Sequence, residues 1–562
     1  MLLSFADRLT KSALPRHLFF LACATFTILF IGYLFGTGDQ VIHIPFLRKE
    51  IDPTLFPNDP FIEMRHQHYT YFWRLFFPLA RLGWLEISMF AVYALVTYAA
   101  FWALWTLAEE LFHNPLTNVL SVTALAFPHV GFAGWPAFEF SLLPRTFVFP
   151  FLLLALILYL RRRYLLAFAL AGALYNLHVV SVNFLLAMFL FNAVWQWRAV
   201  GWRNIVAGLA LFVIGALPVL IWRSRQASLD LSLRPEWLSI VARGTLYNIF
   251  YLFAPYPYIL LPTLSGLSMF GLFAIAHRAH PSPSHGRTIL FFMGAVIIVL
   301  LVEVITAQWL PITLIVQSQI IRVGVFAIVF GYLYFANYLA REYQAGKLAG
   351  WDFGLMTAAL VGTVIAVVPL IIWAIHGWIK PPVVRRAVSV AVQVGMLGLT
   401  LMLAQQFDLW RPGLHIFAPR TPFVEAQVWA RDHTPKATVF IVPPHYWWIY
   451  DSDWRVFSER ATTPQLSDLL MVAFVPQYLD IWAPGFEQVA PGAAAHYQGD
   501  LFANWDIGAK AYYGLSDNAL LQVAREWRAN YLVVEKTQSP PRPWPVAYEN
   551  LEYLIYDLRS AK

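Results

Sequence analysis

The sequence predicts a polytopic α-helical membrane protein with a C-terminal soluble α/β domain. The chain of 562 residues is 59% hydrophobic and 17% aromatic, and its mean hydropathy is +0.58. Repeated apolar runs of about 18–23 residues match the length that a helix needs to cross a bilayer. Beyond residue 407 the apolar runs shorten to strand length and charged residues become common. We expect about 11–13 spans in residues 1–407 and a soluble domain in residues 408–562.

Twelve apolar runs can be marked in the first of these two parts. They cover residues 18–35, 87–107, 116–133, 146–160, 164–177, 179–195, 205–222, 259–276, 289–310, 320–339, 353–375 and 388–403. In hydrocarbon a helix satisfies its own backbone polar groups, so each run is expected to be helical. Pro128 interrupts the third run and predicts a kink. The fifth and sixth runs predict a tight hairpin with His178 at its outer turn.

Basic residues gather at the ends of the runs and orient the chain. The net charge is +7, but this distribution indicates membrane lipids, not nucleic acid, as the partner. Arg8, Lys11 and Arg16 precede the first run, and an arginine triplet at 161–163 follows the fourth, so both flanks are expected in the cytoplasm. The single cysteine, Cys23, excludes an intramolecular disulfide.

Charge alone leaves the side of the soluble domain ambiguous. Twelve spans from a cytoplasmic N-terminus place residues 408–562 inside, whereas Arg385 and Arg386 before the last run favour the outside. One boundary among the last four runs is therefore wrong, or one of these runs is re-entrant. A family resemblance, described below, favours the outside.

The C-terminal part alternates helix-like and strand-like segments. Residues 423–433 and 519–529 predict helices, and residues 437–442, 530–534 and 551–556 predict strands. This mixture indicates a small layered α/β domain.

The stretch 36–61, GTGDQVIHIPFLRKEIDPTLFPNDPF, is the first candidate for function. It holds four acidic residues in a chain that is only 13% charged. Asp39 lies within about one helical turn of the end of the first run, at the membrane surface. A carboxylate there can act as a base or bind a divalent cation; the alternative is a solvated connecting loop. Residues 68–81, HYTYFWRLFFPLAR, predict a helix that lies in the membrane interface.

Further polar residues at the outer ends of runs can converge on the same cavity. Arg145 and Arg322 are candidates to hold a phosphate, because a guanidinium binds two oxygens at once. The alternatives are an Arg145 that snorkels, a Glu139 that pairs with Arg145, and a His178 that only hydrogen-bonds in its turn. The full outward-facing set is Asp39, His43, Asp52, Asp59, Glu139, Arg145, His178, Arg243 and Arg322.

Other noticeable residues have less specific interpretations. His129 and Glu303 are expected to shape helix packing through internal hydrogen bonds. In the soluble domain, Trp447–Trp448 and the segment RVFSER, residues 455–460, either line a substrate face or belong to packed loops. The chain has no Walker loop, paired CxxC, HExxH or GxSxG motif, so none of these supplies a function.

The first loop, the aromatic segment after it and the trailing soluble domain together resemble the GT-C superfamily of integral-membrane glycosyltransferases. More specifically, FGTGDQVIHIPFLRKEIDPTLFPNDPF, VWARDHTPKATVFIVPP and RVFSER look like a bacterial family of uncharacterised membrane proteins with this layout. The resemblance implies a GT-C-like transmembrane domain in residues 1–407, with residues 36–83 as the first outward loop. It also implies a multi-pass protein of the cytoplasmic membrane whose soluble domain lies on the periplasmic side.

In that superfamily an acidic residue of the first outward loop is catalytic, and the matching position here is Asp39. Many members carry paired acids at this motif, whereas Gln40 follows Asp39 here, so dependence on a divalent cation stays open. The sequence does not specify the metal, and Asp39 is the candidate ligand if there is one.

The resemblance therefore implies an enzyme that transfers a sugar from a polyprenyl-phosphate-linked donor to an acceptor glycan, lipid or protein at the outer leaflet. Asp39 is the candidate catalytic residue. The candidate substrate-binding residues are His43, Asp59, Glu139, Arg145, His178, Arg243 and Arg322. Two alternatives are a transporter or flippase, which Arg322 and Glu303 within spans would suit, and a non-catalytic scaffold that keeps the GT-C layout.

Overall fold

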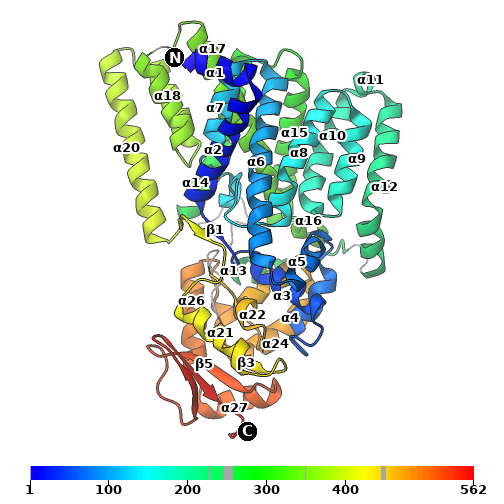
Figure 1. Ribbon diagram of the computed structural model, residues 1–562, viewed down its shortest axis with the longest axis vertical. Coiled ribbons are helices and arrows are strands. Elements are labelled where there is room, and N and C mark those ends of the chain that lie inside the picture. The colour runs from blue at the N-terminus through cyan, green and yellow to red at the C-terminus, as the bar shows by residue number, and fades with distance from the viewer. Residues whose placement is uncertain (1, 227–229, 245–256, 349, 445–450, 562) are drawn as a thin grey trace.

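The computed structural model describes residues 2–226, 230–244, 257–348, 350–444 and 451–561. Trp447 and Trp448 lie outside these described residues. Two parts are evident in Figure 1: long helices side by side form one end, and a small domain with a sheet forms the other. The N-terminus lies at the far end of the helical part and the C-terminus at the far end of the sheet domain.

Seven helices in the described part of the chain are long and apolar enough to cross a membrane. They are α2 (Ala13–Ile31), α6 (Leu85–Phe112), α12 (Trp202–Gln226), α14 (Pro257–Ala279), α15 (Gly286–Gln308), α17 (Gly324–Gln344) with the preceding turn η5 (Ile320–Val323), and α20 (Pro382–Gln406). This architecture is that of a multi-pass membrane protein.

Shorter helices complete the helical part. The apolar ones are α7 (Pro115–Leu125), α8 (Pro144–Leu160), α9 (Tyr164–Tyr175), α10 (Val179–Trp195) and α19 (Val367–Trp378). The others are α1 (Leu2–Lys11), η3 (Phe132–Gly134), α11 (Trp197–Val200), α13 (Pro235–Gly244), α16 (Thr313–Gln317) and α18 (Gly350–Gly362). The predicted hairpin is confirmed, because α9 and α10 flank His178 directly.

The third apolar run is not one kinked helix, as the sequence suggested. Helix α7 ends at Leu125, and the chain turns away before Pro128, whose ring restricts the preceding residue to extended geometry. Val130 then forms β-bridges with Pro136 and Ile365. The segment between α7 and α8 is therefore irregular, and the site described below uses this segment.

The eleventh apolar run folds back on itself. It is split into α18 and α19 at residues 363–366. Asp352 at the start of α18 pairs with Arg385 and Arg386 at the start of α20, and the charges of Asp352 and Arg385 act on His376 near the end of α19. Both ends of the run therefore lie at the same end of the bundle. This re-entrant hairpin places the C-terminal domain at the same end as the first loop.

The C-terminal domain is built on a mixed five-stranded sheet with strand order β4-β3-β5-β7-β6. Its strands are β3 (Val439–Ile441), β4 (Ala461–Thr462), β5 (Tyr531–Glu535), β6 (Val546–Glu549) and β7 (Tyr553–Asp557). Strands β4, β3 and β5 are parallel, and β5, β7 and β6 are antiparallel. The predicted strands correspond to β3, β5 and β7, so the predicted α/β layering is confirmed.

Helices pack around this sheet. They are α21 (Pro422–His433), α22 (Trp454–Ser458), α23 (Leu469–Phe474), α24 (Leu479–Val489), α25 (Ala493–His496), α26 (Leu501–Tyr513) and α27 (Asp517–Glu526), with the short turns η6 (Leu466–Asp468) and η7 (Pro476–Tyr478). The two predicted helices correspond to α21 and α27.

The first loop lies between the two parts of the molecule (Figure 1). It contains α3 (Gln40–Ile51), α4 (Pro60–Glu63), η1 (Met64–Gln67), η2 (Phe72–Phe76) and α5 (Phe77–Arg81). The helix predicted over residues 68–81 is thus formed only from Phe72 onward. Strand β1 (Tyr33–Leu34) pairs in parallel with β2 (Leu414–His415), which ties the end of α2 to the start of the C-terminal domain.

Candidate functional site

Asp39 follows a tight turn at the end of β1. Gly36 has a φ of +78°, which favours glycine, and a Cβ there would lie 2.7 Å from the ring of Phe457. The buried amide of Gln40 accepts a hydrogen bond from Gly36 N at 2.8 Å and donates one to Leu142 O at 2.9 Å. The turn therefore fixes Asp39 between the C-terminal domain and the segment that leads into α8.

Arg145, in the first turn of α8, joins two carboxylates. It donates from Nη1 to Asp39 Oδ2, and from Nε and Nη2 to the two oxygens of Glu139, both at 2.5 Å. The side chains of Arg145, Asp39 and Glu139 are 14%, 20% and 15% exposed. Burial by itself raises the pKa of Asp39, but the charges of Arg145 and Arg322 outweigh it and lower the pKa to about 2.

Arg322 in η5 is a second guanidinium at the same place. Its Cζ lies 4.2 Å from the centroid of the Trp135 ring, and Cζ of Arg145 lies 5.0 Å from the same centroid. Its buried Nε has no hydrogen-bond partner, and among the described residues no carboxylate is within ion-pair distance of it. Asp39 and Glu139 act on Arg322 only from farther away. A half-buried cation in this state is costly, and its site favours an additional anion.

Three histidines surround Asp39. The ring of His43 stacks on Trp73, with centroids 4.9 Å apart, and lies 5.1 Å from the ring of His68. His178, at the N-terminus of α10, has its Nδ1 2.7 Å from Ser181 Oγ. Burial, the neighbouring His68 and Arg145 hold the pKa of His43 well below its usual range, and burial lowers the pKa of His68 to about 4. Both imidazoles are therefore neutral near pH 7.

A narrow pocket opens beside Arg145 and Arg322; about 710 Å³ of space, which includes open solvent at its mouth, is not filled by protein atoms. Its polar lining includes Glu139, Arg145, Ser181 and Arg322. Most of the remaining wall consists of apolar side chains from α6, α8, α10 and α17, together with the irregular segment before α8. The cavity thus combines a charged end with walls suited to a hydrocarbon chain.

The structure brings most of the predicted site residues together. Arg145 and Arg322 line the cavity with Glu139, and Asp39 is bonded to Arg145. His178 lies near the same charged groups, because the charges of Arg145, Arg322 and Asp39 all act on it. Arg145 does not snorkel; it points inward and pairs with Glu139, as one of the alternatives proposed. The side chain of His178 also caps the N-terminus of α10 by accepting a hydrogen bond from Ser181 N, so the hydrogen bond expected in its turn is present as well.

Two predicted substrate-binding residues lie elsewhere. Arg243, in α13, donates from Nε to Ser239 O, and its own carbonyl accepts from Asn504 Nδ2 at 2.6 Å. It therefore belongs to the contact with the C-terminal domain. Asp59 is buried in an ion cluster with Arg455, away from the cavity.

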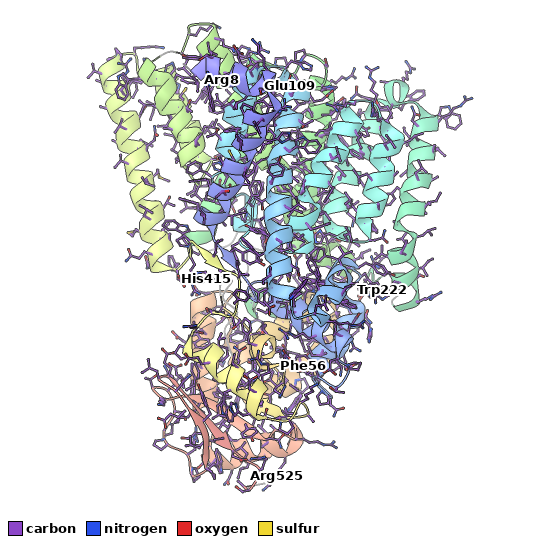
Figure 2. All side chains as sticks on the ribbon, viewed as in Figure 1. Arg8, Phe56, Glu109, Trp222, His415 and Arg525 are labelled. Atoms are coloured by element: carbon purple, nitrogen blue, oxygen red, sulfur yellow. The ribbon has the colours of Figure 1, made fainter. Side chains whose placement is uncertain are left out.

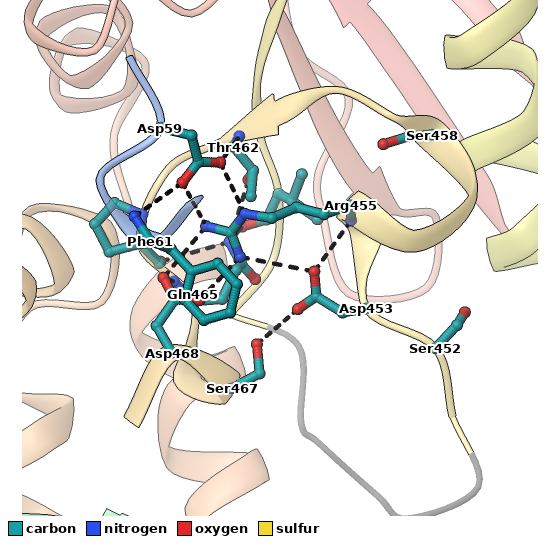
Figure 3. A network of polar contacts seen from close by, with 12 residues as sticks. Asp59, Phe61, Ser452, Asp453, Arg455, Ser458, Thr462, Gln465, Ser467 and Asp468 are labelled. Carbon is teal, nitrogen blue, oxygen red and sulfur yellow. Dashed lines mark hydrogen bonds and ion pairs between the residues drawn. The ribbon is translucent and has the colours of Figure 1, made fainter. Parts of the chain in front are cut away.

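The cluster around Arg455 joins the first loop to the C-terminal domain (Figure 3). Arg455 Nε lies 2.8 Å from Asp59 Oδ2, and Nη1 lies 2.8 Å from Asp468 Oδ1. Asp453 accepts from the backbone N–H of Arg455 and from Ser467 Oγ. Arg455 is 1% exposed, so RVFSER is a packed segment and not a substrate face. We call Arg455, Asp59, Asp453 and Asp468 the Arg455 cluster.

The residues around Asp39 do not suit a divalent cation. Asp39 and Glu139 share one arginine, and a second arginine stands beside them. Positive charge so close disfavours a metal ion. Within the described residues, no three His, Cys, Asp or Glu side chains form a metal-binding group.

The sequence did not single out several residues that shape the site. Trp135 contacts both arginines, and Trp73 holds His43. His68 appeared only as the start of a predicted interfacial helix. The available signal was the aromatic and histidine content of residues 129–140 and 66–77, which is typical of interfaces and is not specific to a site.

Comparison with protein-family models and with curated proteins yields no match.

Proposed function

We propose that this chain is a GT-C-type membrane glycosyltransferase that uses a polyprenyl-phosphate-linked sugar as donor. The observation that carries the proposal is Arg322, a half-buried guanidinium without an anionic partner that lines a largely apolar cavity next to Arg145. An anion attached to a long hydrocarbon chain satisfies both properties of the cavity. A polyprenyl phosphodiester is such a molecule.

In the proposed reaction the bond between the sugar C1 and the phosphate oxygen breaks, and a bond between C1 and the acceptor oxygen forms. The electron pair of the broken bond stays on the leaving polyprenyl phosphate, which gains negative charge. Arg322 and Arg145 stabilise that developing charge in a site largely shielded from water. The proton of the acceptor hydroxyl moves to Asp39.

The pairing of Asp39 with Arg145 sets the order of events. While Arg145 is bound to Asp39, the low pKa makes this carboxylate a weak base. A donor phosphate that binds Arg145 competes with Asp39 for the guanidinium, and the pKa of Asp39 then rises toward its ordinary range. Donor binding thereby prepares the base for the acceptor.

The distribution of charge supports an orientation for the enzyme. Arg8 lies at the end of the helical part farthest from the sheet domain, whereas Arg525 lies on that domain (Figure 2). The arginine triplet at 161–163 follows α8 at the same end as Arg8, where Arg161 pairs with Glu110. By the positive-inside rule that end is cytoplasmic. The first loop, Asp39 and the C-terminal domain then face the periplasm.

The test is sugar transfer by Asp39→Asn and Asp39→Ala, measured as glycan or glycolipid output at matched expression. Loss of a general base lowers the rate about 10²–10⁴-fold. Asp52→Asn is the matched control, because Asp52 belongs to the same loop but pairs with Lys436 and Thr54 at the surface. Full output from both Asp39 variants would remove the catalytic role and favour the non-catalytic scaffold.

A transporter or flippase remains the second candidate because of Glu303. This side chain is 1% exposed in the C-terminal half of α15, and no side chain of the described structure donates a hydrogen bond to its carboxylate. Buried carboxyls within spans serve proton or ion coupling in transporters. Loss of lipid translocation in Glu303→Gln, together with undiminished output from Asp39→Asn, would favour this second function.

A further inference from the structure

A second cavity, lined in part by His43, lies at the first loop. Its empty space is about 380 Å³, and it is lined by α3, by η1 and η2 with the segment between them, by α5 and by Trp222 of α12. Figure 2 shows Trp222 at the level where α12 reaches the helices of the first loop. None of the predicted site residues except His43 lines this cavity.

Polar atoms around this second cavity are left without partners. Trp73 is 6% exposed, and its indole Nε1 has no hydrogen-bond partner. The same holds for His68 Nε2 and for Arg65 Nε, which are also buried. Buried polar groups in folded proteins are almost always hydrogen-bonded. All three atoms belong to residues that line this cavity, and a ligand that supplies hydrogen-bond acceptors would satisfy them.

The other lining groups narrow the chemistry of that ligand. Glu50 contributes a carboxylate, and Arg74 lies 3.7 Å from it, so the wall contains an acceptor as well as donors. Trp73 and Trp222 also line the cavity; one face of Trp73 stacks on His43, and Arg74 Cζ lies 5.3 Å from the centroid of the Trp222 ring. A molecule with many hydroxyl groups both accepts from the indole and guanidine N–H groups and donates to the carboxylate. The apolar face of a pyranose ring packs well against indole.

The second cavity is electrostatically connected to Asp39. The charge of Asp39 acts on both His43 and His68, which line this cavity, while Asp39 itself is bonded to Arg145 of the first cavity. Asp39 is the N-cap residue of α3, one turn before His43, so it lies near the second cavity as well as near Arg145, although it lines neither cavity. We propose that the second cavity binds a saccharide, and that the acceptor of the transfer is a glycan. This inference rests on the proposed function for the role of the saccharide as acceptor, but the binding itself does not depend on it.

The test is saturation-transfer NMR on the full-length protein in an amine-oxide detergent, which contains neither sugar nor phosphate. The probes are methyl glycosides of glucose, galactose, mannose and N-acetylglucosamine, with inorganic phosphate as a separate arm. We expect at least one glycoside to bind. Trp73→Phe removes the indole N–H and keeps a ring beside His43, and it should weaken that binding about fivefold, as the loss of one hydrogen bond does.

Two controls make the outcome specific. Trp84→Phe changes a tryptophan that is 59% exposed near the same end of the helical part, and it should bind the glycoside like the unmodified protein. Binding of a polyprenyl phosphate, the leaving group common to the proposed donors, reports on the first cavity and on correct folding. It should be unchanged in Trp73→Phe.

The outcomes separate the two proposals. If polyprenyl phosphate binds but no glycoside does, the saccharide site is refuted and the proposed function stands. If a glycoside binds with the expected dependence on Trp73 but polyprenyl phosphate does not, the saccharide site stands and the donor site is refuted. Binding of inorganic phosphate in place of glycosides, with dependence on Trp73, would make the second cavity an anion site and contradict the inference.

Discussion

Replacing Arg455 by methionine should destabilise the protein strongly, because it removes the only cation of the Arg455 cluster. Arg455 makes four hydrogen bonds to Asp59 and Asp468, at 2.8, 3.4, 2.8 and 3.3 Å. The side chains of both carboxylates are 0% exposed. The variant leaves these acids without a counter-charge, which costs about 3–5 kcal/mol for a buried pair.

Thermal unfolding in detergent, followed by intrinsic fluorescence, measures this effect. For a domain of about 150 residues, each kcal/mol lost from the free energy of unfolding lowers the melting temperature by about 2–4 °C. The expected fall in melting temperature is therefore on the order of 10 °C. Arg559→Met is the control: Arg559 pairs with Asp557 at 2.6 Å, but its side chain is 57% exposed, so little change is expected.

The double variant Arg455→Met with Asp59→Asn identifies the source of the loss. Because Asp59→Asn removes one of the three carboxylates that remain in the cluster, the double variant should be more stable than Arg455→Met alone. A midpoint for Arg455→Met within about 2 °C of the unmodified protein would show that the cluster does not hold the first loop to the C-terminal domain, and would refute the reasoning.

The remaining predictions concern pH and topology. Burial raises the pKa of Asp468 to about 7, despite Arg455, so the folded protein binds this proton more tightly than the unfolded chain. Its stabilising contribution is fully present below about pH 4 and is lost as the pH rises through about 7. The melting temperature should therefore fall between about pH 4 and 7 relative to that of Asp468→Asn and level off above this range; parallel curves for the two proteins would contradict this. For topology, Leu551→Cys, at a position 83% exposed on the C-terminal domain, should react with an impermeant thiol reagent added from the periplasmic side. Lys347→Cys, 67% exposed at the opposite end, should react only in inverted vesicles, and the buried native Cys23 should give little background; the reverse labelling pattern would overturn the proposed orientation.

The sequence predicted the helices of the membrane part well because long apolar runs leave few alternatives in hydrocarbon. It failed at the third run, which is not one kinked helix, and at the eleventh run, where the break at residues 363–366 is as apolar as the helices beside it. That break depends on tertiary contacts, such as the bridge between Ile365 and Val130, and periodicity does not report such contacts. A re-entrant run was one of the alternatives that the charge pattern left open, and this hairpin is such a run; the N-terminus and the C-terminal domain therefore lie at opposite ends of the helical part.

The candidate site was predictable only where chemistry is unusual for a membrane segment. Arg145 and Arg322 stood out because charge is costly there. The sequence placed Asp59 among the substrate-binding candidates because it is an aspartate of the same loop as Asp39. Its partner, Arg455, lies 396 positions away in the chain, so only the fold separates a structural acid from a candidate catalytic one.

Binding of a polyprenyl phosphate by the purified protein tests the central claim most directly, because this leaving group is common to donors with any sugar. Arg322→Gln removes the unpartnered guanidinium, and Arg81→Gln, an exposed arginine of the first loop, is the matched control. We predict saturable binding that Arg322→Gln weakens at least tenfold, as expected for a charge-assisted hydrogen bond of about 1.5–3 kcal/mol, and that Arg81→Gln leaves unchanged. Equal binding by the unmodified protein and Arg322→Gln, or no binding by either, would contradict the account.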